Sequence, residues 1–532
     1  MRAFLPAKAD WSAATPRDVL AGVTVAVVAL PLALGFGVAS GLGAAAGLVT
    51  AIVAGALAAV FGGSSLQVSG PTGAMTVVLV PIVARFGPGG VLTVGLLAGV
   101  VLLCLAVARI GRYMRYVPAP VVEGFTIGIA AVIALQQVPA ALGVPASTGH
   151  NVVVTAVRAV GAGPVWPAAL LAGGVVVVML VGSRWKPAIP FSLLAVAVGT
   201  AVAEIWSLPV ARIGSLPALL PAPSLSFLDL DALWSLLPSA VAVAALAALE
   251  SLLSATVADG MSVNQRHNPD RELFGQGVAN VVTPLFGGVP ATAAIARTAV
   301  NVRSGATSRL AALVHAATLA VIMLAAAPAV GRIPLAVLAG VLIATAVRMV
   351  EVGSVRVLMR ANRSDAVVLA LTAIATLTLD LVTAVIVGIA VAGALALRAV
   401  ARSARIDVEP LEAGDHTEEE RRLLSEHIVA YRLDGPLFFA AAHRFLLELT
   451  EISAVSVVIL RLSHVSTLDT TGVLVLRDAV EKLEHRGVTV LLSGVREGHR
   501  RQLEVLGVRT FASTPEAIEH ARTHLRLNGT LP

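Results

Sequence analysis

Charged residues are scarce in this sequence. Aspartate, glutamate, lysine and arginine make up 13% of its 532 residues, whereas a soluble globular domain carries about 25%. The deficit is uneven, because residues 18–400 run through long apolar stretches and charges return only after Val400, as in Glu418-Glu419-Glu420. A run of roughly 18 apolar residues is long enough to cross about 30 Å of hydrocarbon. The composition therefore excludes a wholly soluble protein and predicts a membrane part followed by a soluble tail.

Several other features are missing. The single cysteine, Cys104, excludes an intramolecular disulfide framework. No phosphate-binding loop occurs, so direct ATP drive is unsupported, and the eleven histidines show no metal-ligand spacing. Residues 1–17 lack the pattern of a cleaved secretory signal, so we expect the first apolar segment to be retained. The net charge of +6 comes from arginines between apolar runs. We expect no enzymatic activity, cofactor, metal or nucleic-acid partner.

The apolar runs predict about fourteen membrane spans. Two of them, 71–84 and 293–303, are too short to cross a bilayer alone. The spans are expected at residues 18–40, 42–62, 71–84, 88–108, 117–138, 164–182, 188–207, 236–258, 271–286, 293–303, 305–328, 334–348, 363–380 and 382–400.

The distribution of basic residues supports this count and sets the orientation. If the N-terminus is cytoplasmic, the inside loops hold most of the arginines, and the outside loops hold only Arg85, Arg158, Arg212 and Arg332. Cytoplasmic loops of membrane proteins carry such an excess of lysine and arginine. An even number of crossings then leaves both termini, and the soluble tail, in the cytoplasm.

The two short spans share a design. One is opened by Ser69-Gly70-Pro71-Thr72-Gly73-Ala74, and the other by a Gly/Pro/Thr-rich stretch at residues 287–294. Each is the third of seven predicted spans. Short, interrupted segments in matching positions of two halves point to a transporter site built from inverted repeats. Their helix N-termini would meet near the midplane, where free N–H groups and helix dipoles favour an anion.

Arg297 lies about one turn inside the second interrupted helix, away from the cytoplasmic loops. Ionisable residues inside membranes are rare and are normally paired or functional. A transported anion would supply the negative partner that Arg297 needs. The alternative is a structural arginine satisfied by backbone carbonyl groups.

Glu250 is the second ionisable residue inside a span, in a helix that is otherwise nearly apolar. Buried carboxyl groups in spans often belong to proton relays, so Glu250 is a candidate proton-coupling residue. Ser254 lies one turn further along the same face. Two alternatives stay open, which are a permanent ion pair with Arg297 and a Na⁺ site formed by Glu250, Ser254 and backbone oxygens.

The tail alternates strand-like and helical patterns. Residues 428–433, 455–462 and 488–492 read as strands and residues 471–486 as a helix, which predicts a small α/β domain. The segment Leu468-Asp469-Thr470-Thr471-Gly472 and the segment 433–439 are similar to the STAS domain that sulfate permeases share with anti-sigma-factor antagonists. In the antagonists the hydroxyl residue after that aspartate is phosphorylated, which here is Thr470. The alternative is that Asp469 and Thr470 only cap the helix.

Residues 17–405 resemble the sulfate permease (SulP) family, which corresponds to solute carrier family 26. The resemblance rests on four stretches, at residues 18–31, 68–74, 250–277 and 286–305. It implies an α-helical polytopic fold of fourteen spans in two inverted seven-span repeats, divided into core and gate domains, with an elevator motion and a dimeric assembly. Many members have a polar glutamine after the first-span proline, where this chain has Leu32.

The resemblance also implies a pocket lined by spans one, three, eight and ten. Carried onto this chain, it comprises Leu32 and Phe36, then Ser69, Gly70, Thr72, Gly73 and Ala74, then Glu250 with Ser254, and finally Ala294, Ala296 and Arg297.

Together these observations predict a secondary active transporter of a small inorganic or carboxylate anion in a bacterial inner membrane. The candidate substrates are sulfate, a dicarboxylate and bicarbonate, moved by symport with H⁺ or alternatively with Na⁺. The rival hypotheses are uncoupled anion conduction, a membrane sensor that signals through its tail, and a nucleobase carrier on the same fold. The expected divisions are residues 1–17 as a cytoplasmic segment, 18–402 as the transport domain, 403–426 as a linker and 427–525 as the STAS domain.

Overall fold

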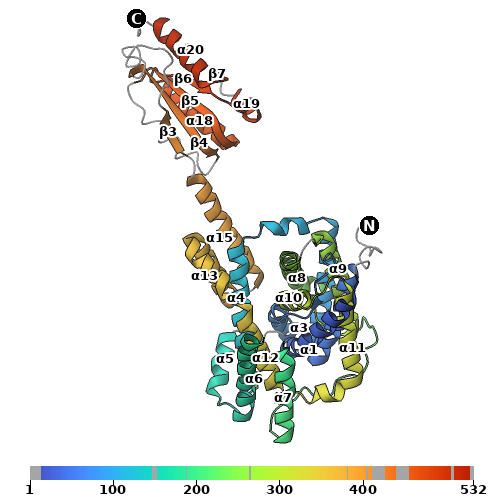
Figure 1. Cartoon of the computed structure of the whole chain (residues 1–532). Helices are drawn as coiled ribbons and strands as arrows, with labels where there is room; N and C mark the ends of the chain where they lie inside the picture. The colour runs from blue at the N-terminus through green and yellow to red at the C-terminus, as the bar shows by residue number, and fades with distance from the viewer. Residues whose placement is uncertain are drawn as a thin grey trace. The chain divides into compact units, whose positions relative to one another are not determined.

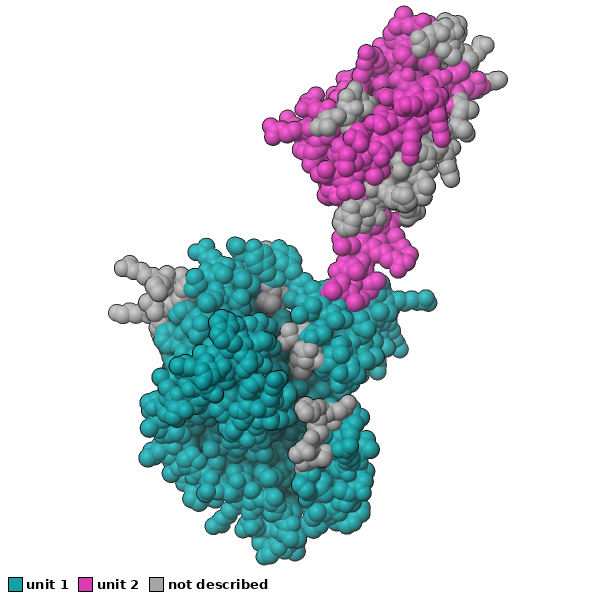
Figure 2. Space-filling model, turned by 180° about the vertical axis from the view of Figure 1, so that it is seen from behind, with its two compact units in different colours: residues 1–389 teal, residues 390–532 magenta. Residues whose placement is uncertain are grey.

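The chain forms two compact units, residues 1–389 and 390–532 (Figure 2). The structure, a computed structural model, describes residues 14–145, 152–186, 189–262, 265–379, 381–402, 405–409, 426–438, 455–504 and 509–527. Most of the predicted N-terminal segment and of the predicted linker lies outside these ranges. The division between the units falls inside the last apolar helix, whereas the sequence placed the domain boundary after it.

Among the described residues of the first unit, the regular elements are helices apart from two very short strands (Figure 1). Among the described residues, nine helical segments are long and apolar enough to span a membrane. The main helices are α1 (Pro16–Ala39), α2 (Ala44–Phe61), α3 (Gly73–Val107), α4 (Ala119–Leu142), α5 (Val152–Gly161), α6 (Trp166–Trp185), α7 (Phe191–Ile205), α8 (Leu233–Met261), α9 (Pro269–Val282), α10 (Ile295–Arg303), α11 (Leu310–Gly331), α12 (Leu335–Met349), α13 (Val352–Ala361), α14 (Arg363–Thr378) and α15 (Leu381–Arg402).

Fourteen spans emerge once α3 is divided. Gly87 interrupts this helix with φ 68° and ψ −175°, a conformation that glycine adopts without the steric cost a side chain would add. Pro88 follows at once, so the break separates the two spans that the sequence predicted at 71–84 and 88–108. Dividing α3 raises the nine long segments to ten spans. The shorter helices α7, α9, α10 and α14 are the remaining four.

Two short helices escaped the sequence analysis. Helix α5 and helix α13 each have ten residues and strongly amphipathic sequences. No residue of α13 is buried. Helix α5 is apolar but too short to span a membrane, and polar residues interrupt the apolar positions of α13, so a search for spans passes over both.

The helices of the first unit pack in two groups (Figure 1). Helices α1, α2, α3, α8, α9, α10 and α11 contact one another extensively, and α4, α6, α12 and α14 form the second group. The grouping matches the expected core and gate domains of two inverted seven-span repeats. The interrupted segments and Arg297 all belong to the core.

Asp18 fastens the start of α1 to the start of α11. Its side chain is fully buried and accepts hydrogen bonds from the backbone N–H groups of Thr15 (2.8 Å), Thr307 (2.7 Å) and Ser308 (2.9 Å). A buried carboxylate that receives several N–H groups joins two helix beginnings that are 290 residues apart in the sequence.

We expect Asp18→Ala to lower the free energy of unfolding by about 3 kcal/mol, because it leaves buried N–H groups without an acceptor. Thermal unfolding of the detergent-solubilised protein measures this. Asp365→Ala is the matched control, because Asp365 also occupies the first turn of a helix, α14, but is only half-buried. Equal melting temperatures for the two variants would contradict the fastening role of Asp18.

The second unit contains a five-stranded sheet in the order β3-β4-β5-β6-β7. Strand β3 pairs antiparallel with β4, and the remaining neighbours are parallel. Its elements are β3 (Arg405–Glu409), β4 (Ile428–Leu437), β5 (Val457–Leu468), α18 (Thr470–Glu484), β6 (Thr489–Ser493), α19 (Glu497–Leu503), β7 (Thr510–Phe511) and α20 (Thr514–Leu527).

The predicted strands and helix of the tail are confirmed, but the predicted linker needs a correction. Residues 405–409 were assigned to the linker and instead form β3, which pairs along its whole length with β4. The five-residue strand sits next to a charged stretch, and its partner lies some 25 residues further along the chain, so its β character depends on a non-local pairing that the local pattern does not reveal.

Candidate functional site

The two interrupted segments meet. Strand β1 (Ser69–Gly70) pairs antiparallel with β2 (Thr292–Ala293), with Ser69 opposite Ala293 and Gly70 opposite Thr292. Helix α3 starts three residues after β1 and α10 starts two residues after β2. The pairing confirms the prediction that the N-termini of these two helices lie together. Their free N–H groups and dipole ends are a suitable environment for an anion.

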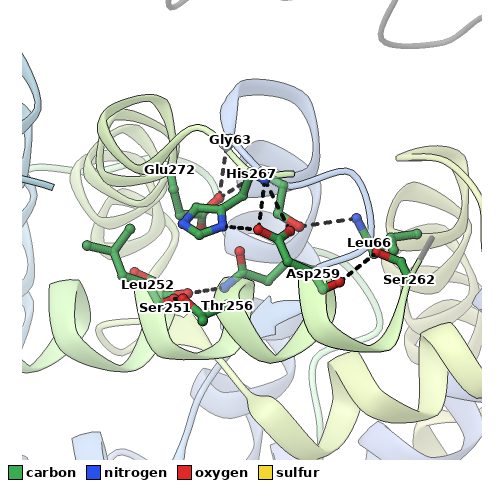
Figure 3. A network of polar contacts seen from close by, with 11 residues as sticks. Gly63, Leu66, Ser251, Leu252, Thr256, Asp259, Ser262, His267 and Glu272 are labelled. Atoms are coloured by element: carbon green, nitrogen blue, oxygen red, sulfur yellow. Dashed lines mark hydrogen bonds and ion pairs between the residues drawn. The ribbon is translucent and has the colours of Figure 1, made fainter. Parts of the chain in front are cut away.

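A polar stripe on α9 holds the two segments in place. Gln276 donates to the Ser69 hydroxyl (2.6 Å). The Asn280 side chain donates to the carbonyl oxygen of Ala291 and accepts from the Ala291 N–H group, at 2.8 Å each. Glu272 accepts from the N–H groups of Gly63 (2.8 Å) and Ser64 (3.2 Å) (Figure 3). Irregular backbone inside a membrane needs such protein partners. The i, i+4, i+8 spacing of these buried polar residues was a visible signal, but their role was not inferred from the sequence.

The loop between α8 and α9 is fastened by an acid–histidine contact. Asp259 of α8 accepts from the His267 backbone N–H (3.1 Å), and its Oδ2 lies 2.7 Å from Nδ1 of His267 (Figure 3). Gln265 of the same loop donates to the Thr307 carbonyl group (2.8 Å). These contacts connect the end of α8 to the start of α11.

Arg297 is almost completely enclosed, with 2% of its surface exposed. Its Nη2 donates to the carbonyl oxygen of Pro71 (2.9 Å), the residue after β1, while Nη1 has no hydrogen-bond partner among the described residues. A Cβ atom on Gly70 would lie 2.5 Å from Nη1. The guanidinium group thus supports the backbone that leads into α3 and places a positive charge behind the two helix N-termini.

Glu250 of α8 turns toward the start of α3. Its side chain is half-buried, and Oε2 accepts a hydrogen bond from the Thr72 hydroxyl (2.8 Å). Thr72 also caps α3 by accepting from the Met75 N–H (3.4 Å). Within the described part of the chain, no ion pair joins Glu250 to Arg297, although the two groups interact electrostatically. The permanent ion pair considered from the sequence therefore finds no support in this geometry.

Ser254 lies one turn from Glu250 and is fully buried. Its hydroxyl donates to Thr298 of α10 (3.1 Å), and the Thr298 oxygen also accepts from the backbone N–H of Val68 (3.2 Å). Helix α8 therefore contacts both interrupted segments, through Glu250 on one side and Ser254 on the other.

The apolar site residues surround the helix N-termini closely. Leu32 and Phe36 of α1 are each 7% exposed, and Ala74 is buried. A Cβ atom on Gly73 would overlap Cδ1 of Ile133 of α4 and lie 3.1 Å from the Phe36 ring, so a larger residue fits here only if these side chains shift. Ala294 is half-buried and Ala296 is exposed.

Thr470 is exposed at the first position of α18, and Asp469 caps this helix by accepting from the Gly472 N–H (2.7 Å). The capping interpretation of Asp469 is thus confirmed, and phosphorylation of Thr470 stays a prediction. Among the described residues, no three histidine, cysteine or acidic side chains lie close enough together to hold a metal ion.

The paired interrupted helices inside fourteen spans define a membrane transporter of the inverted-repeat class. The model of the sulfate permease family matches residues 16–372, and that of the STAS domain matches residues 424–521. The chain therefore belongs to the sulfate permease family, whose members are membrane anion transporters and not enzymes, and it carries a C-terminal STAS domain.

Individual relatives agree with this assignment. The chain is 34% identical to the putative sulfate transporter YvdB of Bacillus subtilis (strain 168), with 92% of this chain and 94% of the relative covered. It is 32% identical to the bicarbonate transporter BicA of Synechocystis sp., with 94% of this chain and 91% of the relative covered. The fold is similar to that of the murine Solute Carrier 26 family member A9 anion transporter in the inward-facing state, with a TM-score of 0.81, 17% identity, and 95% and 91% coverage.

Proposed function

We propose that this protein is a secondary active transporter that carries a small anion, namely sulfate, a dicarboxylate or bicarbonate, together with H⁺. The observation that carries the proposal is the meeting of two helix N-termini at β1 and β2, with the Arg297 guanidinium behind them. The two helix N-termini supply positive partial charges there, and Arg297 supplies a full positive charge. Among the described residues, no acidic side chain within 4 Å balances the charge of Arg297. A bound anion completes this arrangement.

Glu250 supports proton coupling. Its carboxyl group is half-buried next to the proposed anion site and is tied to it through Thr72. A carboxyl group there gains a proton or stays charged according to what occupies the neighbouring site, which links the binding of the two species. The relatives support the candidate substrates, since one carries sulfate in its name and another bicarbonate.

The remaining parts of the proposal concern motion and assembly. We propose that the core group of helices moves against the gate group in an elevator motion, that the protein is a homodimer, and that it resides in a bacterial cytoplasmic membrane with both termini on the cytoplasmic side. The close contact of Gly73 with Phe36 and Ile133 supports a core that packs tightly on the gate at the site. The separation of the helices into two contact groups supports rigid-body movement.

Uptake by proteoliposomes tests the proposal. Labelled sulfate, fumarate and bicarbonate are each offered with and without an inward proton gradient, and in parallel with a Na⁺ gradient. Saturable uptake of one anion that the proton gradient drives above equilibrium is the expected result. Accumulation driven only by Na⁺ would favour the Na⁺ alternative, and uptake that never exceeds equilibrium would favour uncoupled conduction. No transport of any of the three anions would contradict the proposal.

A further inference from the structure

His315 of α11 is the most unusual buried side chain outside the predicted site. Its imidazole ring has no exposed surface. Neither Nδ1 nor Nε2 has a hydrogen-bond partner among the described residues. Burying a polar group without a partner costs roughly 1–3 kcal/mol in proteins. A position that keeps such a group at this cost, deep inside a membrane domain, is a functional hypothesis by default.

The surroundings of His315 connect it to Arg297. A Cβ atom on Gly55 of α2 would lie 3.3 Å from the Ser69 carbonyl oxygen and 3.9 Å from Cδ2 of His315. One turn earlier on α2, the Cα atom of Ala51 lies 3.3 Å from where a Cβ atom on Gly70 would stand.

Strand β1 thus packs against one turn of α2. On that turn, Gly55 has both the Ser69 carbonyl oxygen and His315 as neighbours, and Ala51 is a neighbour of Gly70. Nη1 of Arg297 lies 2.5 Å from the same Cβ position on Gly70. His315 lies near enough to Arg297 for the guanidinium group to disfavour a positive charge on the imidazole ring.

The unpartnered atoms in this region are chemically complementary. Nη1 of Arg297 can only donate, whereas a neutral imidazole accepts at one nitrogen and donates at the other. Next to a buried guanidinium, a second positive charge is unfavourable, so the imidazole stays neutral. Gln276, which donates to the Ser69 hydroxyl, leaves its own Oε1 without a partner. Buried waters typically make about three hydrogen bonds to polar groups of this kind.

We propose that His315 is a positioning residue for Arg297, which it holds through internal water on the α2 side of β1. A water accepts from the guanidinium Nη1 and donates to the imidazole, while Nη2 stays on the Pro71 carbonyl group. The guanidinium plane is then fixed behind the helix N-termini. This inference rests on the proposed function of the site and adds to it a residue that contacts no anion but sets the anion affinity.

The test compares variants of the full-length protein in detergent and in proteoliposomes. His315→Leu removes both nitrogens at similar volume, His315→Gln keeps one acceptor and one donor, and Leu319→Met is the matched control. Leu319 is a fully buried residue one turn further along α11. Dissociation constants for sulfate, fumarate and bicarbonate, the KM and maximal rate of uptake, and the melting temperature are measured for each.

For His315→Leu we expect about a tenfold weaker anion affinity and a correspondingly higher KM, with a similar maximal rate and an equal or higher melting temperature. The melting temperature is expected to hold because the loss of the water-mediated hydrogen bonds is offset by an apolar side chain that needs no partner in this buried position. We expect His315→Gln to bind within about twofold to threefold of the unmodified protein, and Leu319→Met to leave the affinity unchanged. If His315 served only the stability of the fold, His315→Leu would change the melting temperature and leave the KM of uptake unchanged.

Two results would overturn the inference. One is wild-type affinity in His315→Leu, and the other is a failure of His315→Leu, His315→Met and His315→Phe alike to fold, which would make the histidine structural. An unmodified protein that binds none of the three anions would instead defeat the proposed function itself, and the inference with it. Comparing the unmodified protein with the variants therefore separates the two failures.

Discussion

Arg297→Ala is expected to abolish saturable anion uptake. The variant removes the only side-chain charge that the structure places directly behind β1 and β2 within its described residues, and it frees the Pro71 carbonyl group that the guanidinium holds. Loss of one partner of a buried charged contact costs about 2–5 kcal/mol, which corresponds to roughly a thirtyfold to several-thousandfold weaker affinity. Anion binding and the concentration dependence of uptake measure this effect.

The control for Arg297 lies on the same helix. Arg303 is exposed in the last turn of α10, and Arg303→Ala is expected to transport with an unchanged KM. Arg297→Lys keeps a positive charge but loses the planar geometry of the guanidinium, so an intermediate affinity is expected. Melting temperatures verify that each variant is folded. A folded Arg297→Ala protein with normal apparent affinity would remove Arg297 from the site and leave only the helix N-termini to attract the anion.

Glu250→Gln is expected to uncouple transport from the proton gradient. Glutamine keeps an oxygen that accepts from Thr72 and has nearly the same volume, so the start of α3 and the fold are preserved. It cannot take up a proton, so the anion equilibrates across the membrane but no longer accumulates. The expected loss is the whole gradient-driven accumulation, while anion exchange between the two sides continues.

Accumulation by this variant is measured with an inward proton gradient at several external pH values. Glu204→Gln is the control, because Glu204 forms an ion pair with Arg212 (3.0 Å) at the surface of the same unit. That variant should accumulate the anion as the unmodified protein does. If Glu250→Gln still concentrates the anion in proportion to the proton gradient, the coupling group lies elsewhere and the carboxylate of Glu250 serves only to position Thr72.

Much of the fold follows from local features of the sequence. The lengths of the apolar runs predict the spans, and the positions of the arginines agree with their number. Gly70, Pro71 and Gly73 mark the interruption before α3, because closely spaced glycine and proline residues disfavour a continuous helix. The pairing of β1 with β2 could also be anticipated, since two matching interruptions in an inverted repeat must meet at the repeat interface.

Sequence alone was less informative about side-chain partners. It placed Glu250 and Arg297 in the same region but left open whether they form an ion pair. In the structure, the Glu250 carboxylate accepts a hydrogen bond from Thr72, and the Arg297 guanidinium donates one to the Pro71 carbonyl group. It gave no reason to choose His315 among eleven histidines, because burial without a partner depends on how α11 packs against its neighbours. Strand β3 was missed for a similar reason, since a five-residue strand is defined by its neighbour.

By itself, then, the sequence determined that this is a membrane transporter of the inverted-repeat class, because hydrophobic length, charge bias and helix-breaking residues act over a few positions along the chain. Only the tertiary structure decided which atoms of the site face each other. Hydrogen bonds such as those of Glu250 with Thr72 and of Thr298 with Val68 act over about 3 Å. These residues are 178 and 230 positions apart in the sequence, and they reach that distance only after the helices have packed.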